Sequence, residues 1–288
     1  MAKFRPDRLI KESLGTKNLD ERMEAIRRDG LYGSPSSHRT FALWGMGLDK
    51  PKEKADNVIV FGCFPPFANQ KDIQTYFKLL DKLGIEYTWL EEENCCGSPV
   101  LDRSLDPQGE RRELVMETAK ESVAKNIAGA RERGAKRIVH MCVWCTYVGK
   151  MLFPDDEIAQ VHLQDILLDR LATEDLRVEP TTLGYFEGCH VQGHFLTPGV
   201  KINYAPFREL MGTVKGLEIV DLPKHLCCVT EMDTIVEEVE RLNLKTVISP
   251  CTSCTIRLRR ALAGKAEVKS PQAILLEGLG QAEQLAAE

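Results

Sequence analysis

Residues 57–63 of the chain read NVIVFGC, and residues 245–251 read KTVISPC. Each stretch is a short apolar run that ends at a cysteine, and each is followed by a segment with helical periodicity. A strand, a loop and a helix in this order make up a βαβ unit, whose two strands pair in parallel. The two stretches therefore predict an α/β fold with parallel sheets.

The same order of elements recurs along both halves of the chain. In the first half we predict strands at residues 57–62, 85–90 and 137–141, and helices at residues 72–83 and 110–133. In the second half we predict strands at residues 182–188, 217–221 and 245–250, and helices at residues 204–211 and 230–242. Each predicted strand ends at or shortly before a cysteine, and ligands of open parallel sheets bind beyond the carboxyl ends of the strands.

The two halves also end alike. Residues 159–161 (AQV) and 164–169 (QDILLD) correspond to residues 266–268 (AEV) and 272–277 (QAILLE). Duplication is the simplest explanation of such a repeated order. The sequence therefore predicts two pseudo-symmetric Rossmann-like lobes with parallel sheets.

Changes in composition suggest where these lobes begin and end. The charged stretch at residues 171–180 contains Pro180 and is the natural boundary between them. We predict three segments: an N-terminal arm at residues 1–54, a first lobe at 55–175 and a second lobe at 176–288. Within the arm, a helix at residues 19–28 should end at the Gly/Ser/Pro-rich stretch 30–37. The arm is either a solvated terminus or a docking segment for a partner subunit.

Composition limits the class of protein. With 288 residues, 43% of them hydrophobic, the chain can bury a core without help from disulfides or metals. The net charge is -5 and the basic residues are dispersed among acidic ones, so nucleic acid is not an expected partner. There is no apolar core of a signal peptide and no run of roughly 18 apolar residues that would span a membrane. We expect a cytoplasmic protein.

All ten cysteines fall into two sets with the same order. Each set has one cysteine, then an adjacent pair, then a C-x-x-C. The gaps are 31 and 45 residues in the first set, and 37 and 22 residues in the second. The first set is Cys63, Cys95, Cys96, Cys142 and Cys145, and the second is Cys189, Cys227, Cys228, Cys251 and Cys254.

This pattern favours metal binding over disulfides. Adjacent cysteines have Cα atoms about 3.8 Å apart, which is below the usual disulfide range of about 4.4 to 6.8 Å. Cysteines are also normally reduced in the cytoplasm. A structural zinc ion takes four ligands, so five thiolates per set fit a cluster of several iron atoms better. The alternatives are zinc bound by four cysteines with one to spare, and buried free cysteines that act as small hydrophobic residues.

The duplicated order C, CC-G, C-x-x-C resembles the CCG-domain family, and in particular the B subunit of heterodisulfide reductases. The resemblance covers residues 56–280 and implies a noncubane [4Fe-4S] iron–sulfur cluster in each lobe, held by the five cysteines of that lobe. One departure lies at the second pair, which is followed by Val229 where the first is followed by Gly97. The 22-residue gap after Cys228 is also shorter than the family usually shows. The second cluster is therefore expected to differ in geometry, potential or type.

The resemblance also implies a function. In the family a disulfide is cleaved between the two clusters, so this chain is expected to be an oxidoreductase subunit that acts on a small disulfide or sulfur-carrier substrate. Electrons would come from an HdrC-like ferredoxin-type subunit and an HdrA-like flavin subunit, since the chain has no ferredoxin-like cysteine run of its own. The alternative is a noncatalytic electron-transfer subunit of a larger flavin and iron–sulfur complex, acting in sulfur oxidation, electron bifurcation or hydroxy-acid oxidation.

Polar residues next to the cysteines are further candidates. His190 and His194 follow Cys189 closely and are either proton donors to a leaving thiolate or structural histidines. Hydrogen bonds to sulfur are expected from polar groups around the two C-x-x-C motifs, with ordinary loop and helix-start residues as the alternative. These groups are Trp144, Thr146, Tyr147, Thr252 and Ser253.

Overall fold

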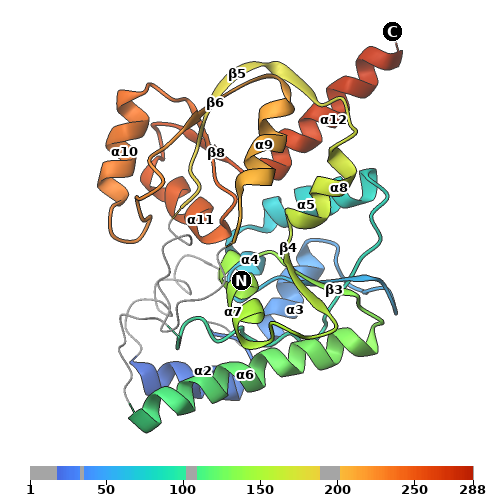
Figure 1. Ribbon diagram of the computed structural model, residues 1–288, viewed down its shortest axis with the longest axis vertical. Helices are drawn as coiled ribbons and strands as arrows, with labels where there is room; N and C mark the ends of the chain where they lie inside the picture. Colours follow the sequence, from blue (N-terminus) through green and yellow to red (C-terminus); the bar gives the residue numbers. More distant parts are fainter. Residues whose placement is uncertain (1–17, 33–35, 102–108, 189–201, 288) are drawn as a thin grey trace, which may run out of the picture. The chain divides into compact units, whose positions relative to one another are not determined.

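The computed structural model describes residues 18–32, 36–101, 109–188 and 202–287. Two four-stranded sheets, both entirely parallel, lie in this part of the chain (Figure 1). Helices connect successive strands of each sheet. The predicted α/β fold with two Rossmann-like lobes is confirmed.

The first sheet has the strand order β2-β1-β3-β4. Its central strands pair over their full length, from Asn57 opposite Arg137 to Val60 opposite His140. The strands are β1 (Asn57–Val60), β2 (Thr88–Trp89), β3 (Arg137–His140) and β4 (Ala159–His162). Helices in this part of the chain are α2 (Leu19–Asp29), α3 (Ser36–Gly45), α4 (Pro65–Ala68), α5 (Gln70–Lys82), α6 (Gly109–Glu132), α7 (Val143–Leu152) and α8 (Asp165–Leu171).

The second sheet repeats this arrangement. Its order, β6-β5-β7-β8, again places the first strand in sequence between the second and the third. The strands are β5 (Arg177–Tyr185), β6 (Lys215–Asp221), β7 (Thr246–Ile248) and β8 (Glu267–Lys269). The helices are α9 (Ala205–Thr213), α10 (Met232–Arg241), α11 (Thr252–Ala261) and α12 (Pro271–Ala287). Equal topology in the two halves agrees with the duplication predicted from the sequence.

The strands β1, β3 and β7 carry apolar residues, as expected where helices cover both faces of a parallel sheet. Val58 and Ile59 in β1 and Val139 in β3 are fully buried, as are Val247 and Ile248 in β7. The apolar runs that predicted the strands therefore form the cores of the two sheets.

One strand differs from its prediction. The sequence placed a strand at residues 182–188 and a domain boundary at 171–180, but β5 already begins at Arg177. Arg177 pairs with Lys215, and the register shifts before Thr181. Pro180 lies within this irregularity, where a missing backbone N–H is tolerated. The proline therefore marks a bulge inside a strand and does not end the element.

The described part of the predicted N-terminal arm packs on the first sheet's helices. Helix α2 starts at a capping box formed by Asn18 and Glu21 and ends at Gly30, whose φ is +69°. Met23 and Ile26 on its inner face are buried, and α2 runs beside α6 (Figure 1). The predicted helix and its glycine stop are therefore both present.

The chain divides into two compact units. One unit holds Glu86–Leu163 and the described residues up to Gln70, and the other holds Lys71–Ile85 and the described residues from Gln164 onward. Helix α5 thus belongs to the second unit, although it connects two strands of the first sheet. The predicted domain boundaries after residues 54 and 175 remain predictions.

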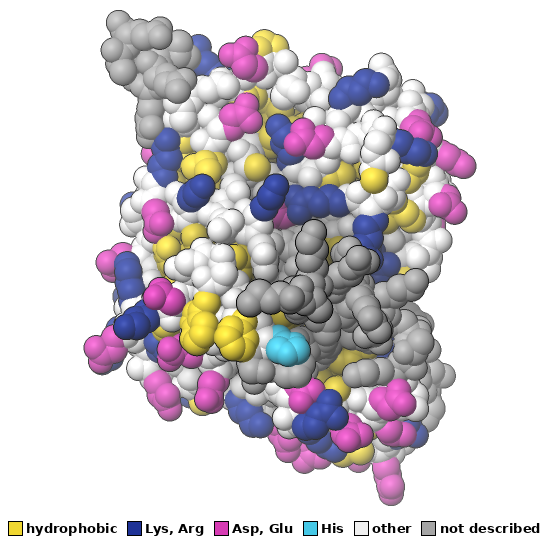
Figure 2. Space-filling model, turned by 180° about the vertical axis from the view of Figure 1, so that it is seen from behind, with side chains coloured by type: hydrophobic (Ala, Val, Ile, Leu, Met, Phe, Trp, Pro, Cys, Tyr) yellow, Lys and Arg dark blue, Asp and Glu magenta, His cyan; other side chains and the backbone are white. Residues whose placement is uncertain are grey.

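The surface of the chain carries mixed charge. Figure 2 shows acidic and basic side chains scattered over the face that it presents. In the described ranges, no helix combines the length and the apolar character needed to cross a membrane.

Candidate functional site

The cysteines of the first set converge at the carboxyl edge of the first sheet. Cys63 follows β1, and Cys142 follows the neighbouring strand β3, where it is the N-cap residue of α7. Cys145 lies in the first turn of that helix. Cys95 and Cys96 lie in the loop after β2. Because parallel strands end at the same edge, three separate loops deliver five sulfur atoms to one place.

The five thiols form a continuous row. Hydrogen bonds join neighbouring thiols of this row, whose order is Cys63, Cys95, Cys96, Cys145 and Cys142. All are buried except Cys142, which is half-buried. Hydrogen bonds from Cys145 and Cys95 lower the pKa of the Cys96 thiol. The pKa of the Cys95 thiol is raised by its hydrogen bonds to Cys63 and Cys96. The first predicted ligand set is thus brought together in full.

The second set is described for four of its five cysteines. The Cys254 thiol donates to Sγ of Cys228 at 3.3 Å, and hydrogen bonds to Cys228 and Cys251 raise the pKa of Cys254. Cys251 is the N-cap residue of α11, as Cys142 is of α7. Cys227 is buried beside Cys228. Cys189, His190 and His194 lie outside the described residues.

The two cysteine pairs share one local hydrogen bond. The backbone N–H of Gly97 donates to Sγ of Cys95, and that of Val229 donates to Sγ of Cys227, both at 3.4 Å. The residue after each pair therefore holds the first sulfur of the pair in the same manner.

Two backbone contacts reach the first site from the segment that the sequence assigned to an arm. The N–H of Tyr32 donates to Sγ of Cys63 at 3.4 Å. The N–H of Cys95 donates to the carbonyl oxygen of Gly30 at 2.6 Å. Sequence reasoning found the helix stop at Gly30 but not these contacts, because backbone hydrogen bonds leave no residue signature in a loop.

A buried carboxylate lies two residues before the first cysteine pair. Glu93 accepts the backbone N–H groups of Phe61 and Gly62 at 2.8 and 2.6 Å and pairs with Arg39 at 3.1 Å. Burial raises the pKa of Glu93, while Arg39 and the two amides act in the opposite direction. Sequence reasoning missed this role, because Glu93 is the last of three consecutive glutamates and such runs are usually exposed to solvent.

The hydroxyl groups near the cysteines bond either to backbone carbonyl oxygens or to sulfur. Thr146 donates to the carbonyl oxygen of Cys142 at 3.2 Å, and Thr255 donates to that of Cys251 at 3.0 Å. Thr146 was predicted to donate to sulfur, but a hydroxyl has one proton, and here it binds the preceding helical turn. Ser98, which the sequence did not single out, does bond to the Cys96 sulfur.

A buried histidine, His140, ends β3 two residues before Cys142. Its Nε2 atom lies 2.6 Å from Oε1 of Gln160 in β4. Both residues are buried, and burial lowers the pKa of His140 to about 4. The ring is therefore neutral near pH 7 and donates to the amide oxygen. The second lobe has Ser249 at the corresponding position before its C-x-x-C.

The donor set can be compared with the metal groups considered from the sequence. None of the nine described cysteines forms a disulfide. Among the described residues, no three His, Cys, Asp or Glu side chains form a ready-made site for a single metal ion. A row of five thiols with backbone N–H donors to sulfur fits an iron–sulfur cluster, whose ligands are cysteine thiolates.

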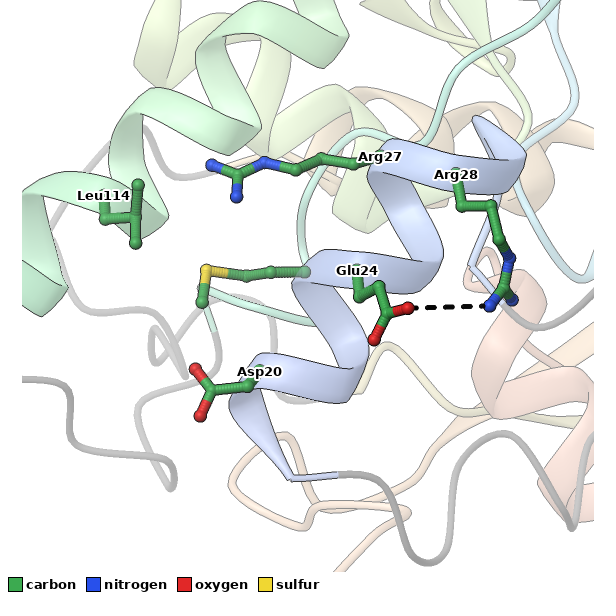
Figure 3. A pocket seen from close by; sticks show the side chains of 6 residues that line it. Asp20, Glu24, Arg27, Arg28 and Leu114 are labelled. Carbon is green, nitrogen blue, oxygen red and sulfur yellow. Dashed lines mark ion pairs between the residues drawn. The ribbon is translucent and has the colours of Figure 1, made fainter.

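A surface pocket also lies between α2 and α6 (Figure 3). Asp20, Glu24, Arg27 and Leu114 line it, together with Met23 and Arg28. Arg28 lies 4.0 Å from Glu24, one helical turn earlier. The pocket contains no cysteine and is not part of the cysteine site.

Comparison with known proteins agrees with the cysteine pattern. Residues 58–148 match the family model of the CCG cysteine-rich domain. The D subunit of the dihydromethanophenazine:CoB–CoM heterodisulfide reductase of Methanosarcina acetivorans is 25% identical over 264 residues, which cover 80% of this chain and 61% of the relative. The corresponding protein of Methanosarcina barkeri is 25% identical over 192 residues, covering 62% and 44%.

A relative with another name matches a shorter stretch. Lactate utilization protein A of an Exiguobacterium species is 28% identical over 168 residues, which cover 54% of this chain and 63% of the relative. The chain thus spans between 44% and 63% of the length of these three relatives. The reductase relatives are D subunits, whereas the sequence pattern resembled the B subunit. In its cysteine pattern and its matched domain at residues 58–148, this chain is similar to CCG-domain proteins, and along most of its length it is similar to heterodisulfide reductase subunits.

Proposed function

We propose that this chain is an iron–sulfur subunit that reduces a disulfide, or forms one in the reverse direction, within a heterodisulfide reductase-like complex. The observation that carries the proposal is the row of five thiols from Cys63 to Cys142, four of them buried. The likeness to two heterodisulfide reductase subunits supports the sulfur chemistry. The reducing cytoplasm is the location that we propose, because it keeps such thiols available.

Each lobe would hold one cluster through its five cysteines. A cubane cluster uses four thiolates, so five favour the noncubane [4Fe-4S] type. The ligands would be Cys63, Cys95, Cys96, Cys142 and Cys145 in the first lobe, and Cys189, Cys227, Cys228, Cys251 and Cys254 in the second. The N-cap positions of Cys142 and Cys251 support thiolate binding, because a helix N-terminus favours negative charge.

Reduction of a disulfide consumes two electrons and two protons and yields two thiols. When bound, the two clusters would supply the electrons one at a time. His190 and His194 are the proposed proton donors, since they follow Cys189 closely. Electrons would reach this chain from an HdrC-like ferredoxin-type subunit and an HdrA-like flavin subunit. The substrate class is a small disulfide or a sulfur carrier.

A second candidate is a noncatalytic electron-transfer subunit. The likeness to lactate utilization protein A favours it, because that name refers to the use of a hydroxy acid and not of a disulfide. In this case the chain would pass electrons within a flavin and iron–sulfur complex and would not bind a disulfide.

The two candidates can be separated by one experiment. The full chain is purified without oxygen, its iron, sulfide and zinc are quantified, and EPR spectra are recorded during stepwise oxidation with and without a disulfide. Variants Cys145→Ala and Cys254→Ala assign each signal to a lobe. Two signals, at least one of them changed by the disulfide, support the reductase. A disulfide-insensitive signal supports electron transfer, and zinc without sulfide contradicts both.

A further inference from the structure

The carboxylate of Glu93 connects two of the loops that carry first-set cysteines. It binds the amides of Phe61 and Gly62, and Gly62 directly precedes Cys63. Glu93 itself lies two residues before Cys95. The loops of Cys63 and of the cysteine pair, separated by 31 residues of sequence, are thus joined through one side chain. Hydrogen bonds from two amides to a carboxylate are charge-assisted and therefore strong.

Arg39 fixes this carboxylate from the other side. Its side chain is 1% exposed and that of Glu93 is 0% exposed. It donates to the carbonyl oxygens of Leu90 and Glu91 at 2.8 and 3.1 Å, and its guanidinium lies 5.5 Å from the centre of the Phe61 ring. Arg39 therefore holds both the strand end before Glu93 and the residue whose amide Glu93 binds.

A buried ion pair of this kind is weak evidence for a purely stabilising role. Removing two charges from water is unfavourable, and apolar replacements of such pairs are often neutral or stabilising. The bonds of Arg39 and Glu93 to four backbone groups point instead to the fixing of loop geometry.

We propose that Arg39 and Glu93 are positioning residues that set the spacing between Cys63 and the Cys95–Cys96 pair in the first site. The pair lies outside the cysteine motif, and Arg39 lies outside residues 58–148 that match the CCG domain. Helix α3, which contains Arg39, therefore contributes to the geometry of the first site. The proposal rests on the proposed function only in its spectroscopic readout.

The test compares Glu93→Gln, Arg39→Met and the double variant with a matched control, Glu92→Gln. Glu92 is the exposed neighbour of Glu93, so the control makes the same chemical change outside the pair. On the anaerobically purified full chain, mass spectrometry follows the alkylation rates of Cys63, Cys95, Cys251 and Cys254. EPR spectra and melting temperatures are recorded on the same samples.

In Glu93→Gln we expect alkylation of Cys63 and Cys95 to accelerate about tenfold. One of the two carboxylate oxygens becomes an NH2 group, which cannot accept an amide proton, so the loops open more often. Cys251 and Cys254 should keep their rates, and the first-lobe EPR signal should change. Glu92→Gln should match the wild type. In the double variant the melting temperature should recover relative to Arg39→Met, because no charge stays buried alone, whereas alkylation and EPR should stay altered.

Two results would overturn the proposal. One is that the Glu93→Gln variant is alkylated at Cys63 and Cys95 at the same rate as the wild type. The other is a double variant in which melting temperature, alkylation and EPR signal all return to wild type, since that would make the pair purely structural. A wild-type chain without iron and sulfide would contradict the proposed function but not the positioning role, because the alkylation rates still decide it.

Discussion

Gly97 packs so closely against Ala119 of α6 that a Cβ atom at Gly97 would lie 2.7 Å from the Cα atom of Ala119. Gly97 also has a φ of +82°, which side chains with a Cβ rarely adopt. Both reasons for the glycine after the first cysteine pair, positive φ and close approach, are therefore present. Val229, after the second pair, is 56% exposed, and Asn243 is the one described non-glycine residue with positive φ.

The substitution Gly97→Val should damage the first site. A β-branched residue at positive φ and overpacking against α6 should together lower the free energy of unfolding by about 3 kcal/mol. Urea unfolding measures this loss, and the first-lobe EPR signal should weaken in parallel. The reciprocal variant Val229→Gly should change the free energy of unfolding by about 1 kcal/mol or less. Equal effects of the two variants would show that the pairs have the same requirement.

We predict that any side chain at position 149 of α7 disturbs the buried pair of His140 and Gln160. A Cβ there would lie 2.6 Å from Oε1 of Gln160 and 3.2 Å from Nε2 of His140. Alanine is usually better than glycine inside a helix by about 1 kcal/mol, yet Gly149→Ala should destabilise by about 1 to 2 kcal/mol because it breaks the His140–Gln160 hydrogen bond.

The control is Gly280→Ala in α12, where a Cβ would meet nothing within 4 Å. It should stabilise by up to about 1 kcal/mol in the same urea unfolding assay. Stabilisation by Gly149→Ala as well would mean that Gln160 moves aside at no cost.

The strands and the cysteine edge could be predicted because their signals are local. An apolar run such as residues 57–60 defines a buried parallel strand, and a cysteine after it must lie at the carboxyl edge. The contrast between Gly97 after the first pair and Val229 after the second is also visible in the sequence, and of these two residues only Gly97 has a positive φ in the structure. The strands and the cysteines that follow them depend on residues close along the chain, so the sequence contains them.

What the sequence could not predict depends on distant partners. Arg39 and Glu93 are both charged residues that would ordinarily be exposed, and their burial is explained by their mutual contact and by their bonds to four backbone groups. The early start of β5 and the bulge at Pro180 could not be predicted, because a bulge can be recognised only once the paired strand is known. For Thr146 the sequence leaves open a bond to sulfur or an ordinary role at the helix start, and the carbonyl oxygen that it binds is identified only in the helix.

Arg259 of α11 and Asp72 of α5 should contribute to stability as a pair, so that the effects of their substitutions are not additive. Their side chains share two hydrogen bonds of 2.7 and 2.8 Å across 187 residues of sequence. A double-mutant cycle with Asp72→Asn and Arg259→Met should give a coupling energy of about 1 to 2 kcal/mol in urea unfolding, because the pair is bidentate and partly buried. The exposed pair Glu238–Arg241 should give less than about 0.5 kcal/mol in the same cycle. Equal couplings would mean that solvent screens both pairs alike.

Ser98 should tune the potential of the proposed first-lobe cluster without being needed to bind it. Its hydroxyl and its backbone N–H both bond to the Cys96 sulfur and lower the pKa of that thiol. Donors to sulfur stabilise the more negative, reduced state of a cluster. Ser98→Ala keeps the backbone donor and removes the hydroxyl, so the midpoint potential of the first cluster should fall while iron and sulfide per chain stay constant. EPR-monitored redox titration measures the potential, and the second-lobe cluster in the same sample is the control. Loss of iron would make Ser98 a structural requirement of the site, and an unchanged potential would mean that the hydroxyl proton does not reach the cluster.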